Sequence, residues 1–408
     1  MGDVERHPAE ADTGDARVVV RVATRIENVP AADWDACAAG GGEFQQDSIR
    51  PDNPFVSHAF LKALEDSGSA ARETGWLPQH LLYEDGDGRL LACMPCYLKS
   101  HSQGEFVFDH GWAEAYMRAG GRYYPKLQAS VPFTPVSGPR LLARAGTDPI
   151  QRQAILLQAG RTLAEELGVS SLHLTFMTRE EWVLAGRLGY LKRTDQQFHW
   201  RNEGYESFDD FLAALSSRKR KTIRKERRAA LEDGIEIEWI TGRDLTEAHW
   251  DAFFAFYMDT GARKWGTPYL TRECFSLLGQ SMAEQLLLVL AKRDGDYIAG
   301  ALNVIGADTL YGRYWGATEM HDFLHFEVCY YQAIDYAIEN RLACVEAGAQ
   351  GAHKLARGYL PVETYSAHYI ADPGLRRAVA DYLERERRAV AHEAALLAEE
   401  SPYHRDKD

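Results

Sequence analysis

The sequence predicts a mixed α/β fold made of two copies of one unit, with a helical region between them. Two segments share the order apolar strand, Asp- and Gly-rich turn, apolar strand: LLYEDGDGRLLACMPC at residues 81–96 and LLVLAKRDGDYIAGALNV at residues 287–304. A helical pattern and a further strand pattern follow each of them. A repeat of this kind indicates a tandem duplication, and a chance likeness of two hairpins is the alternative.

The first unit is predicted over residues 18–202, after a polar leader at residues 1–17 that we expect to be disordered. Its first helix has Ser57 as a plausible N-cap, and Phe60, Leu61 and Leu64 share one apolar face. A proline-rich stretch at residues 126–142 reads as an edge strand or a loop. The other expected elements are helices at residues 53–70, 151–167 and 179–190, a strand, turn and strand within residues 79–99, and strands at residues 105–116, 170–177 and 196–200.

A helical region is predicted over residues 203–283, followed by the second unit over residues 284–372. In the second unit we expect three strands within residues 283–317, a helix at residues 325–340, and strands at residues 343–348 and 364–370. Residues 373–408 are predicted as a charged amphipathic helix and a tail.

Composition limits the function classes. The chain has 408 residues, of which 45% are hydrophobic, as in a globular protein. Its net charge of −14 excludes a globally basic nucleic-acid binder. No apolar run approaches the ~18–20 residues that a membrane helix needs, and the leader lacks the features of a signal peptide, so we expect a cytoplasmic protein.

The cysteine and histidine patterns do not predict a metal site. Cys93 and Cys96 form the only close pair, and a lone CxxC within a strand pattern favours two core cysteines. The fourteen histidines show no ligand spacing such as HExxH.

One loop has the composition of an anion site. The stretch EAGAQGAHKLARGYLP, residues 346–361, follows a predicted buried strand. Gly348, Gly351 and Gly358 allow a positive φ and close backbone approach. Lys354 and Arg357, three residues apart, are spaced to clamp one phosphate or carboxylate. The alternative is a glycine-rich connection with solvated cations.

A basic run in the helical region is a second candidate anion site. SRKRKTIRKERR, residues 217–228, holds eight cations and one Glu. On a helix, Arg220, Lys221, Arg224, Arg227 and Arg228 share a face. Leu212, Leu215, Ile223 and Leu231 mark the buried side. The run is suited to tRNA, a nucleotide-linked substrate or anionic lipid, or else it is a solvated helix paired with surface acids. The candidate patch is Arg218, Lys219, Lys221, Arg224, Lys225 and Arg228.

Several long, irregular motifs resemble those of one known family. They include NPFVSHAFLKALEDSGSA, GWLPQHLL, RYYPKLQASVPFTPVSGPRLL, RKWGTPYLTR, LYGRYWGA, HFEVCYYQAIDYAIE and GAQGAHKLARGYLP, and they lie within residues 53–386. In these motifs the chain resembles the bacterial Fem-like N-acyltransferases, also described as peptidoglycan biosynthesis and recognition proteins. The resemblance implies a tandem duplicated GNAT fold with a helical insertion, and transfer of an acyl or aminoacyl group to an amine.

The resemblance also implies site residues. HKLARGY is similar to the Fem motif Phe-Lys-x-x-Phe-Gly, which places Lys354 near the reacting carbonyl or a substrate phosphate. The residues expected to bind substrate or donor are Gln350, Gly351, His353, Arg357, Gly358, Tyr359, Asp109, Trp112, Tyr314 and Trp315, with Asp109 and Trp112 contributed by the first unit.

Transfer to an amine also needs a proton acceptor. Glu327 and His325 lie at the start of the predicted helix beside this loop, and Tyr330 follows one turn later. Each is a candidate catalytic residue, although a Glu at a helix start is also favoured by the helix dipole alone. No GxSxG motif is present, so we expect direct transfer without a covalent intermediate.

The donor is predicted from an absent pattern. The segment GATEMHDFLHFE lacks the Q/R-x-x-G-x-G/A sequence that binds CoA pyrophosphate in GNAT enzymes, and so does SGPRLLARAGTDPIQ. This favours aminoacyl-tRNA over acyl-CoA as the donor, with no tightly bound cofactor. The expected acceptor is a cell-wall precursor or another small amine, and peripheral contact with the membrane is a further expectation. The alternatives are an acyl-CoA-dependent enzyme with a non-standard site, and a non-catalytic protein that binds peptidoglycan or nucleic acid.

Overall fold

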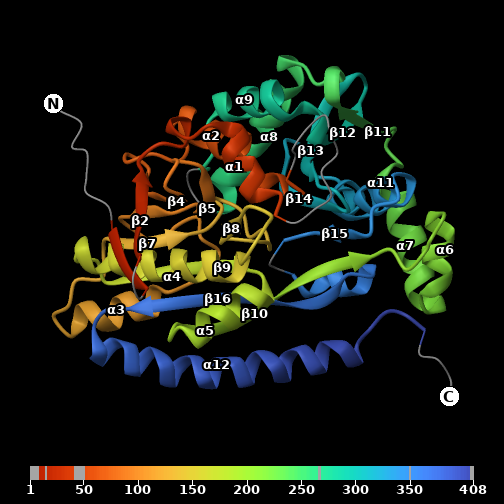
Figure 1. Ribbon diagram of the computed structural model, residues 1–408. Coiled ribbons are helices and arrows are strands. Elements are labelled where there is room, and N and C mark those ends of the chain that lie inside the picture. Colours follow the sequence, from red (N-terminus) through yellow and green to blue (C-terminus); the bar gives the residue numbers. More distant parts are fainter. Residues whose placement is uncertain (1–8, 14–15, 41–50, 265–267, 349–350, 405–408) are drawn as a thin grey trace. The chain divides into compact units, whose positions relative to one another are not determined.

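The computed structural model describes residues 9–13, 16–40, 51–264, 268–348 and 351–404. The chain forms two compact units (Figure 1). Unit 1 consists of the residues up to Asp195 together with Thr364–Val390, and unit 2 of Gln196–Glu363 together with the residues from Ala391 on.

Unit 1 contains a five-stranded antiparallel sheet of order β1-β2-β4-β5-β8 and a second set of strands of order β16-β9-β7-β6-β3. The predicted hairpin at residues 81–96 is formed by β4 and β5. The strands are β1 (Ala9–Thr13), β2 (Ala16–Ala23), β3 (Trp76–Pro78), β4 (His80–Glu84), β5 (Leu90–Met94), β6 (Tyr97–Lys99), β7 (Lys126–Ala129), β8 (Leu142–Ala143), β9 (Ser171–Met177) and β16 (Leu360–Ile370).

The helices of unit 1 pack their apolar faces on these strands. The helix α4 lies against β4, β5 and β9 (Figure 1) and buries Leu156 and Leu163 there. Ser57 caps α2 as predicted, by accepting a hydrogen bond from Phe60 N at 3.2 Å. Cys93 and Cys96 are fully buried core residues, also as predicted. The helices are η1 (Ile26–Asn28), α1 (Ala31–Ala38), η2 (Pro54–Val56), α2 (His58–Asp66), α3 (His110–Arg118), α4 (Pro149–Glu166), α5 (Arg179–Arg187) and α12 (Pro373–Glu399), of which the part up to Val390 belongs to unit 1.

Unit 2 has strands in the order β11-β12-β13-β14-β15-β10, with β14 and β15 parallel and the other pairs antiparallel. The second predicted hairpin is formed by β12 and β13. The bounds are β10 (Leu191–Arg201), β11 (Glu236–Thr241), β12 (Leu286–Arg293), β13 (Asp296–Ile305), β14 (Thr309–Ala317) and β15 (Cys344–Glu346).

The helices of unit 2 cover this sheet. The helix α8 packs on β13 and β14 so closely that a Cβ on Gly316 would lie 2.1 Å from the Phe256 carbonyl oxygen, so only glycine fits there. The helices are α6 (Phe208–Ala214), α7 (Ser217–Ala230), η3 (Gly242–Asp244), α8 (Glu247–Lys264), α9 (Arg272–Met282), η4 (Ala283–Gln285), α10 (Leu324–Phe326), η5 (Glu327–Tyr331), α11 (Gln332–Glu339) and η6 (Ala352–Arg357).

The structure divides the chain at places other than the predicted residues 202, 283 and 372. Residues 203–283 are not wholly helical, because they contain β11, which pairs with β12. They are also part of unit 2, since Leu212, Leu215 and Ile223 share one core with Leu287. The predicted helical region is therefore a component of the second unit.

Two strands complete sheets formed by the other half of the chain. In β16, Tyr365–Ile370 pair with β9 of unit 1, although the sequence predicted this strand as part of the second unit. In β10, His199–Arg201 pair with β15 of unit 2. The chain therefore exchanges one strand in each direction.

The predicted strand at residues 105–116 is wrong. Phe106 has a φ of 59°, which no strand allows, and His110–Arg118 form α3. The physical reason is charge. Lys99 and Lys126 are directly opposed on β6 and β7, where two like charges repel. Glu105 and Asp109 leave the strand geometry and approach these lysines instead.

These four side chains form a buried charge network. Lys126 is fully buried, and its Nζ donates to Asp109 Oδ2 at 2.5 Å, Glu105 Oε2 at 2.7 Å and Ser102 Oγ at 2.8 Å. Burial disfavours the charge on Lys126, but the two carboxylates raise its pKa above the usual value. Burial lowers the pKa of Lys99 to about 7. Unit 1 therefore depends on a cation at Lys126.

Within the described residues, every helix is too short or too polar to span a bilayer.

We predict that Lys126→Met lowers the free energy of unfolding by about 3–5 kcal/mol, because it leaves two buried carboxylates with one cation of weakened charge. Urea unfolding followed by circular dichroism measures the change. Lys62→Met is the matched control. It removes an exposed lysine paired with Asp66 and is expected to cost less than about 1 kcal/mol. Equal stability of the two variants would contradict the proposed dependence on Lys126.

Candidate active site

The strands β14 and β15 stop pairing in the middle of the unit 2 sheet. They pair in parallel only over Thr309–Tyr311 and Cys344–Glu346, and β14 continues to Ala317. The β13–β14 register shifts at the same level, which places Arg313 in a bulge. Its guanidinium donates to Glu346 Oε1 at 2.7 Å and to Glu346 O at 3.1 Å. This buried ion pair marks the point where the two strands separate.

The side-chain amine of Lys354, a residue of η6, lies beside the backbone carbonyls that follow β15. Lys354 is 3% exposed, and its Nζ donates to Ala347 O at 2.6 Å and Gly348 O at 3.0 Å. Burial lowers the pKa of Lys354 to about 8, and the charge of Arg313 acts in the same direction. The candidate catalytic lysine is thus a buried cation held by the carbonyls that follow β15.

The predicted helix at residues 325–340 is interrupted by a π-helical turn. It consists of α10, the π-helical η5 and α11. Single π-helical turns are often found at functional sites, because the wider turn changes the direction of its side chains. Here Tyr330 Oη lies 3.0 Å from His353 Nε2, whereas Tyr331 Oη donates to Glu226 of α7.

An aromatic cluster of Trp315, His325, Phe326, Tyr330 and His353 surrounds this turn. The ring centroids of His325 lie 5.1 Å from Trp315 and 5.4 Å from Tyr330, and Phe326 is 5.7 Å from His353. His353 is exposed, whereas Tyr330 is buried. Four predicted site residues, Trp315, His325, Tyr330 and His353, are therefore close together.

Tyr314 does not join the cluster. Neighbouring residues of a strand point to opposite faces, and Tyr314 packs against Tyr257 of α8 with ring centroids 5.5 Å apart. Tyr314 and Trp315 therefore lie on opposite faces of β14, and the predicted binding role of Tyr314 stays a prediction.

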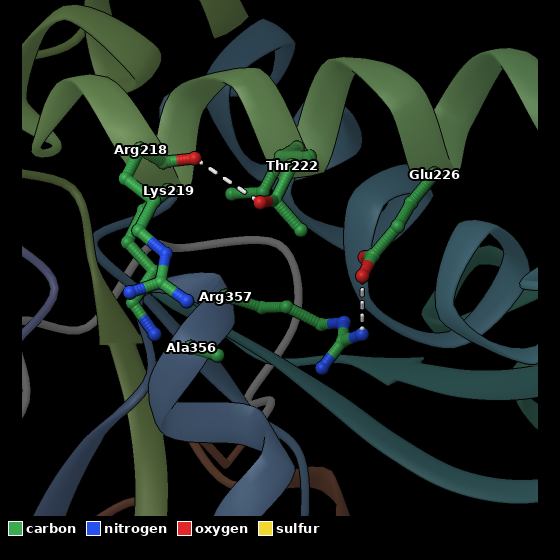
Figure 2. Close-up of a pocket in the computed structure, with 7 residues that line it drawn as sticks. Arg218, Lys219, Thr222, Glu226, Ala356 and Arg357 are labelled. Atoms are coloured by element: carbon green, nitrogen blue, oxygen red, sulfur yellow. Dashed lines mark hydrogen bonds and ion pairs between the residues drawn. The ribbon is translucent and has the colours of Figure 1, made fainter.

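A pocket of about 290 Å³ lies between α7 and η6, which are the two segments predicted as anion sites (Figure 2). Glu226 on α7 and Arg357 on η6 form an ion pair at 2.9 Å. Arg357 also donates to His353 O at 2.7 Å, and its guanidinium lies 3.4 Å from the ring centroid of Phe326. Residues from both predicted segments line the pocket: Arg218, Lys219, Thr222, Ile223, Glu226, Ala356 and Arg357.

Lys354 and Arg357 do not form the predicted joint clamp. Lys354 bonds to carbonyls after β15, whereas Arg357 bonds to Glu226 and to the His353 carbonyl. The two cations therefore serve different parts of the site.

The basic run is divided among three environments. Arg218 and Lys219 line the pocket. Arg227 pairs with Glu327 at 2.9 Å and with Asp335 at 2.6 Å, so its predicted place on the cationic face is wrong. The remaining patch residues are exposed and do not line the pocket, and Arg224 pairs with Asp209: Lys221, Arg224, Lys225 and Arg228. The predicted buried Leu231 is 37% exposed, because α7 has ended before it.

Glu327 is an ion-pair partner inside unit 2. Its side chain is 0% exposed and accepts hydrogen bonds from Arg227 and, at 2.7 Å, from Gln332 Nε2. Burial raises the pKa of Glu327, and Arg227 opposes the rise. With its oxygens bonded, the carboxylate is poorly placed to accept a proton from a substrate.

Several predicted binding residues have structural contacts. Gly358 has a φ of 89°, and a Cβ there would lie 2.7 Å from the Phe211 ring. Gly351 has a φ of 112°, and Tyr359 is fully buried with its hydroxyl bonded to Tyr330 O. Gln350 lies outside the described residues.

Asp109 and Trp112 both lie in unit 1. Asp109 belongs to the charge network with Lys126, and Trp112 packs edge-on against His368 at 5.0 Å. Both side chains are buried, and these contacts lie within unit 1.

Four polar residues of the site were not predicted from the sequence. Arg313 lies inside the LYGRYWGA motif, and Glu226 is the one acid of the basic run, so both had a local signal. Glu346 and His199 had none, because their partners are distant in sequence. His199 pairs with Glu346 across β10 and β15, and burial lowers the pKa of this imidazole.

The chain is similar to several solved structures. FemX matches with a TM-score of 0.54 and 13% identity, over 86% of this chain and 98% of FemX. The C-terminal domain of an Agrobacterium fabrum protein described as a lysylphosphatidylglycerol synthetase matches with a TM-score of 0.50 and 9% identity, over 87% and 95%. A tandem GNAT protein from the clavulanic acid biosynthesis pathway matches with a TM-score of 0.44 and 10% identity, over 87% and 99%.

The likeness to FemX confirms the predicted fold class, which is a mixed α+β, tandem GNAT-like fold. No protein of curated function matches the sequence. A family model named FemAB-like, with the description peptidoglycan biosynthesis/recognition, matches residues 25–405. Because that match covers well over half of the chain, the protein belongs to the FemAB-like family.

Proposed function

We propose that this protein is an N-acyltransferase that moves an acyl or aminoacyl group directly onto an amine. The observation that carries this proposal is the position of η6. In this short helix, Lys354 contacts the carbonyls that follow β15, His353 contacts the aromatic cluster, and Arg357 lines the pocket. Membership of a peptidoglycan biosynthesis/recognition family supports an amine of a cell-wall precursor as the acceptor.

Lys354 is proposed to polarise the acyl carbonyl. Because the pKa of Lys354 is about 8, its amine is protonated in most molecules at neutral pH. Two of its three N–H groups bond to backbone carbonyls, and the third has no acceptor among the residues that the structure describes. A fixed N–H donor aimed at a carbonyl oxygen stabilises the negative charge that develops there during attack by the amine.

His353 is proposed to accept the proton of the attacking amine. It is exposed, and Tyr330 fixes its ring through the 3.0 Å contact between Oη and Nε2. Imidazole is the side chain most often used for this role. His325 lies within the same cluster and is the second candidate, with ring centroids 6.3 Å apart.

Aminoacyl-tRNA is the proposed donor. The exposed cations Lys221, Lys225 and Arg228 on α7 suit a polyanion. The name of the Agrobacterium fabrum neighbour, which describes an aminoacylated lipid, also favours an aminoacyl donor. Acyl-CoA is the alternative donor.

The proposal is tested with purified protein, an amine acceptor and labelled donors. We expect transfer from aminoacyl-tRNA and a steep decrease of its rate with added salt. Transfer from acetyl-CoA alone would replace the proposed donor, and the absence of transfer from both would contradict the enzyme proposal.

We predict that Lys354→Met lowers kcat/KM by about 10²–10³-fold, as for loss of one donor to the oxyanion. In the wild-type protein, activity should fall as the pH rises through about 8, because the Lys354 ammonium loses its proton there. A pH–rate profile measures both effects. Activity that instead rises above this pH would mean that Lys354 acts as a base.

We predict opposite effects for His353→Asn and Glu327→Gln. His353→Asn should lower kcat by about 10²–10⁴-fold and leave stability within about 0.5 kcal/mol, because the side chain is exposed. Glu327→Gln should destabilise the fold by about 3 kcal/mol, because Arg227 loses a buried partner. Turnover per folded molecule and urea unfolding separate the two effects. A loss of turnover in Glu327→Gln with unchanged stability, together with full turnover in His353→Asn, would indicate Glu327 as the base.

A further inference from the structure

The pocket between α7 and η6 contains more positive than negative charge. Arg218, Lys219 and Arg357 contribute three cations to its lining, and Glu226 contributes one carboxylate. Glu226 already bonds to Arg357 and accepts a hydrogen bond from Tyr331. Arg218 and Lys219 have no acidic partner among the described residues. The lining therefore carries a net charge of about +2, and two of its cations have no ion-pair partner within the described part of the chain.

Arg357 is held in place before any ligand arrives. It is 6% exposed, and Glu226, the His353 carbonyl and the face of Phe326 each fix its guanidinium. Its buried Nε–H has no hydrogen-bond acceptor within the described residues. A buried donor without an acceptor is costly unless a ligand supplies one, and a fixed side chain loses little entropy when it binds.

The charge and the size of the pocket indicate the ligand. A phosphate monoester or a diphosphate carries close to two negative charges at neutral pH, whereas a single carboxylate would neutralise only half of the excess. The volume of about 290 Å³ is at the lower limit of ligand sites, which suits a phosphate or diphosphate group rather than a whole nucleotide or lipid chain. Arginine and lysine together are the usual protein ligands of phosphate oxygens.

We propose that this pocket binds the phosphate or diphosphate group of a substrate, with Arg218, Lys219 and Arg357 as its ligands. The assignment of this group to a substrate of the transfer reaction rests on the proposed function. Arg357 follows Lys354 by one turn of η6, so a phosphate bound there would anchor a molecule whose reacting end lies beside Lys354. The phosphate group can belong to a nucleotide or to a lipid-linked molecule.

The test is calorimetric titration of the full chain with inorganic pyrophosphate. We expect saturable binding that weakens at least about tenfold in Arg218→Ala/Lys219→Ala, because each lost cation removes charge-assisted hydrogen bonds. Lys221→Ala/Arg224→Ala is the matched control, because it also removes one lysine and one arginine from α7, at exposed positions that do not line the pocket. It should bind pyrophosphate within about twofold of the wild type, since exposed charges contribute little.

Equal weakening in both double variants would overturn the proposal, because it would show a general effect of helix charge. Absence of saturable binding at millimolar pyrophosphate would overturn it as well. Tighter binding of uridine diphosphate than of pyrophosphate would identify a nucleotide source, and tighter binding of farnesyl diphosphate a lipid source.

The titration tests the phosphate site and the transfer assay tests the proposed function, and either proposal can fail without the other. Lys354→Met should lose transfer but keep pyrophosphate binding, because its Nζ bonds to carbonyls and not to the pocket. If the wild type shows no transfer while Arg218→Ala/Lys219→Ala still loses pyrophosphate binding, the proposed function fails and the phosphate site stands. If transfer occurs but pyrophosphate does not bind, the phosphate site fails and the proposed function stands.

Discussion

The buried carboxylate of Glu226 joins the three segments that make up the candidate active site. It projects from α7, bonds to Arg357 of η6 and accepts a hydrogen bond from Tyr331 of the π-helical η5. Through Arg357 it also fixes the His353 carbonyl and the ring of Phe326. The relative positions of the pocket, the aromatic cluster and Lys354 therefore depend on one acid. In the sequence this acid looks like an exception within a basic run, but in the fold it is the reason that the run can lie against a buried arginine.

A second constraint acts at Lys354. Burial disfavours its charge, and two carbonyl oxygens at the end of β15 favour it, so the ammonium is retained with a pKa of about 8. Those carbonyls are accessible to Lys354 because β15 stops pairing with β14 at Glu346, where Arg313 fills the bulge. The same irregularity thus positions the lysine and brings the charge of Arg313 near it, which adds to the larger effect of burial in lowering its pKa.

Sequence patterns predict what depends on neighbouring residues. Both hairpins, the Ser57 cap and the grouping of His325, Tyr330 and His353 follow from turn residues, capping chemistry and motif likeness, and the structure contains them. The failures involve partners far apart in the chain. No local signal shows that Glu105 and Asp109 are needed to offset two opposed lysines, and their apolar surroundings imitate a strand. Arg227 has the spacing of a surface cation, and only its ion pairs with the distant Glu327 and Asp335 make it half-buried.

The exchange of strands between the two units has a consequence for synthesis on the ribosome. Multidomain chains usually complete their N-terminal domain while the rest is still being translated. Here β9 can pair with β16 only when residues up to Ile370 have emerged, so the first unit cannot finish folding until nearly the whole chain is synthesised. Until then, one edge of β9 has unsatisfied backbone groups, which is the state of a sheet most open to wrong pairing. The nascent protein therefore depends on late closure of both units, and a premature stop anywhere before β16 leaves neither unit complete.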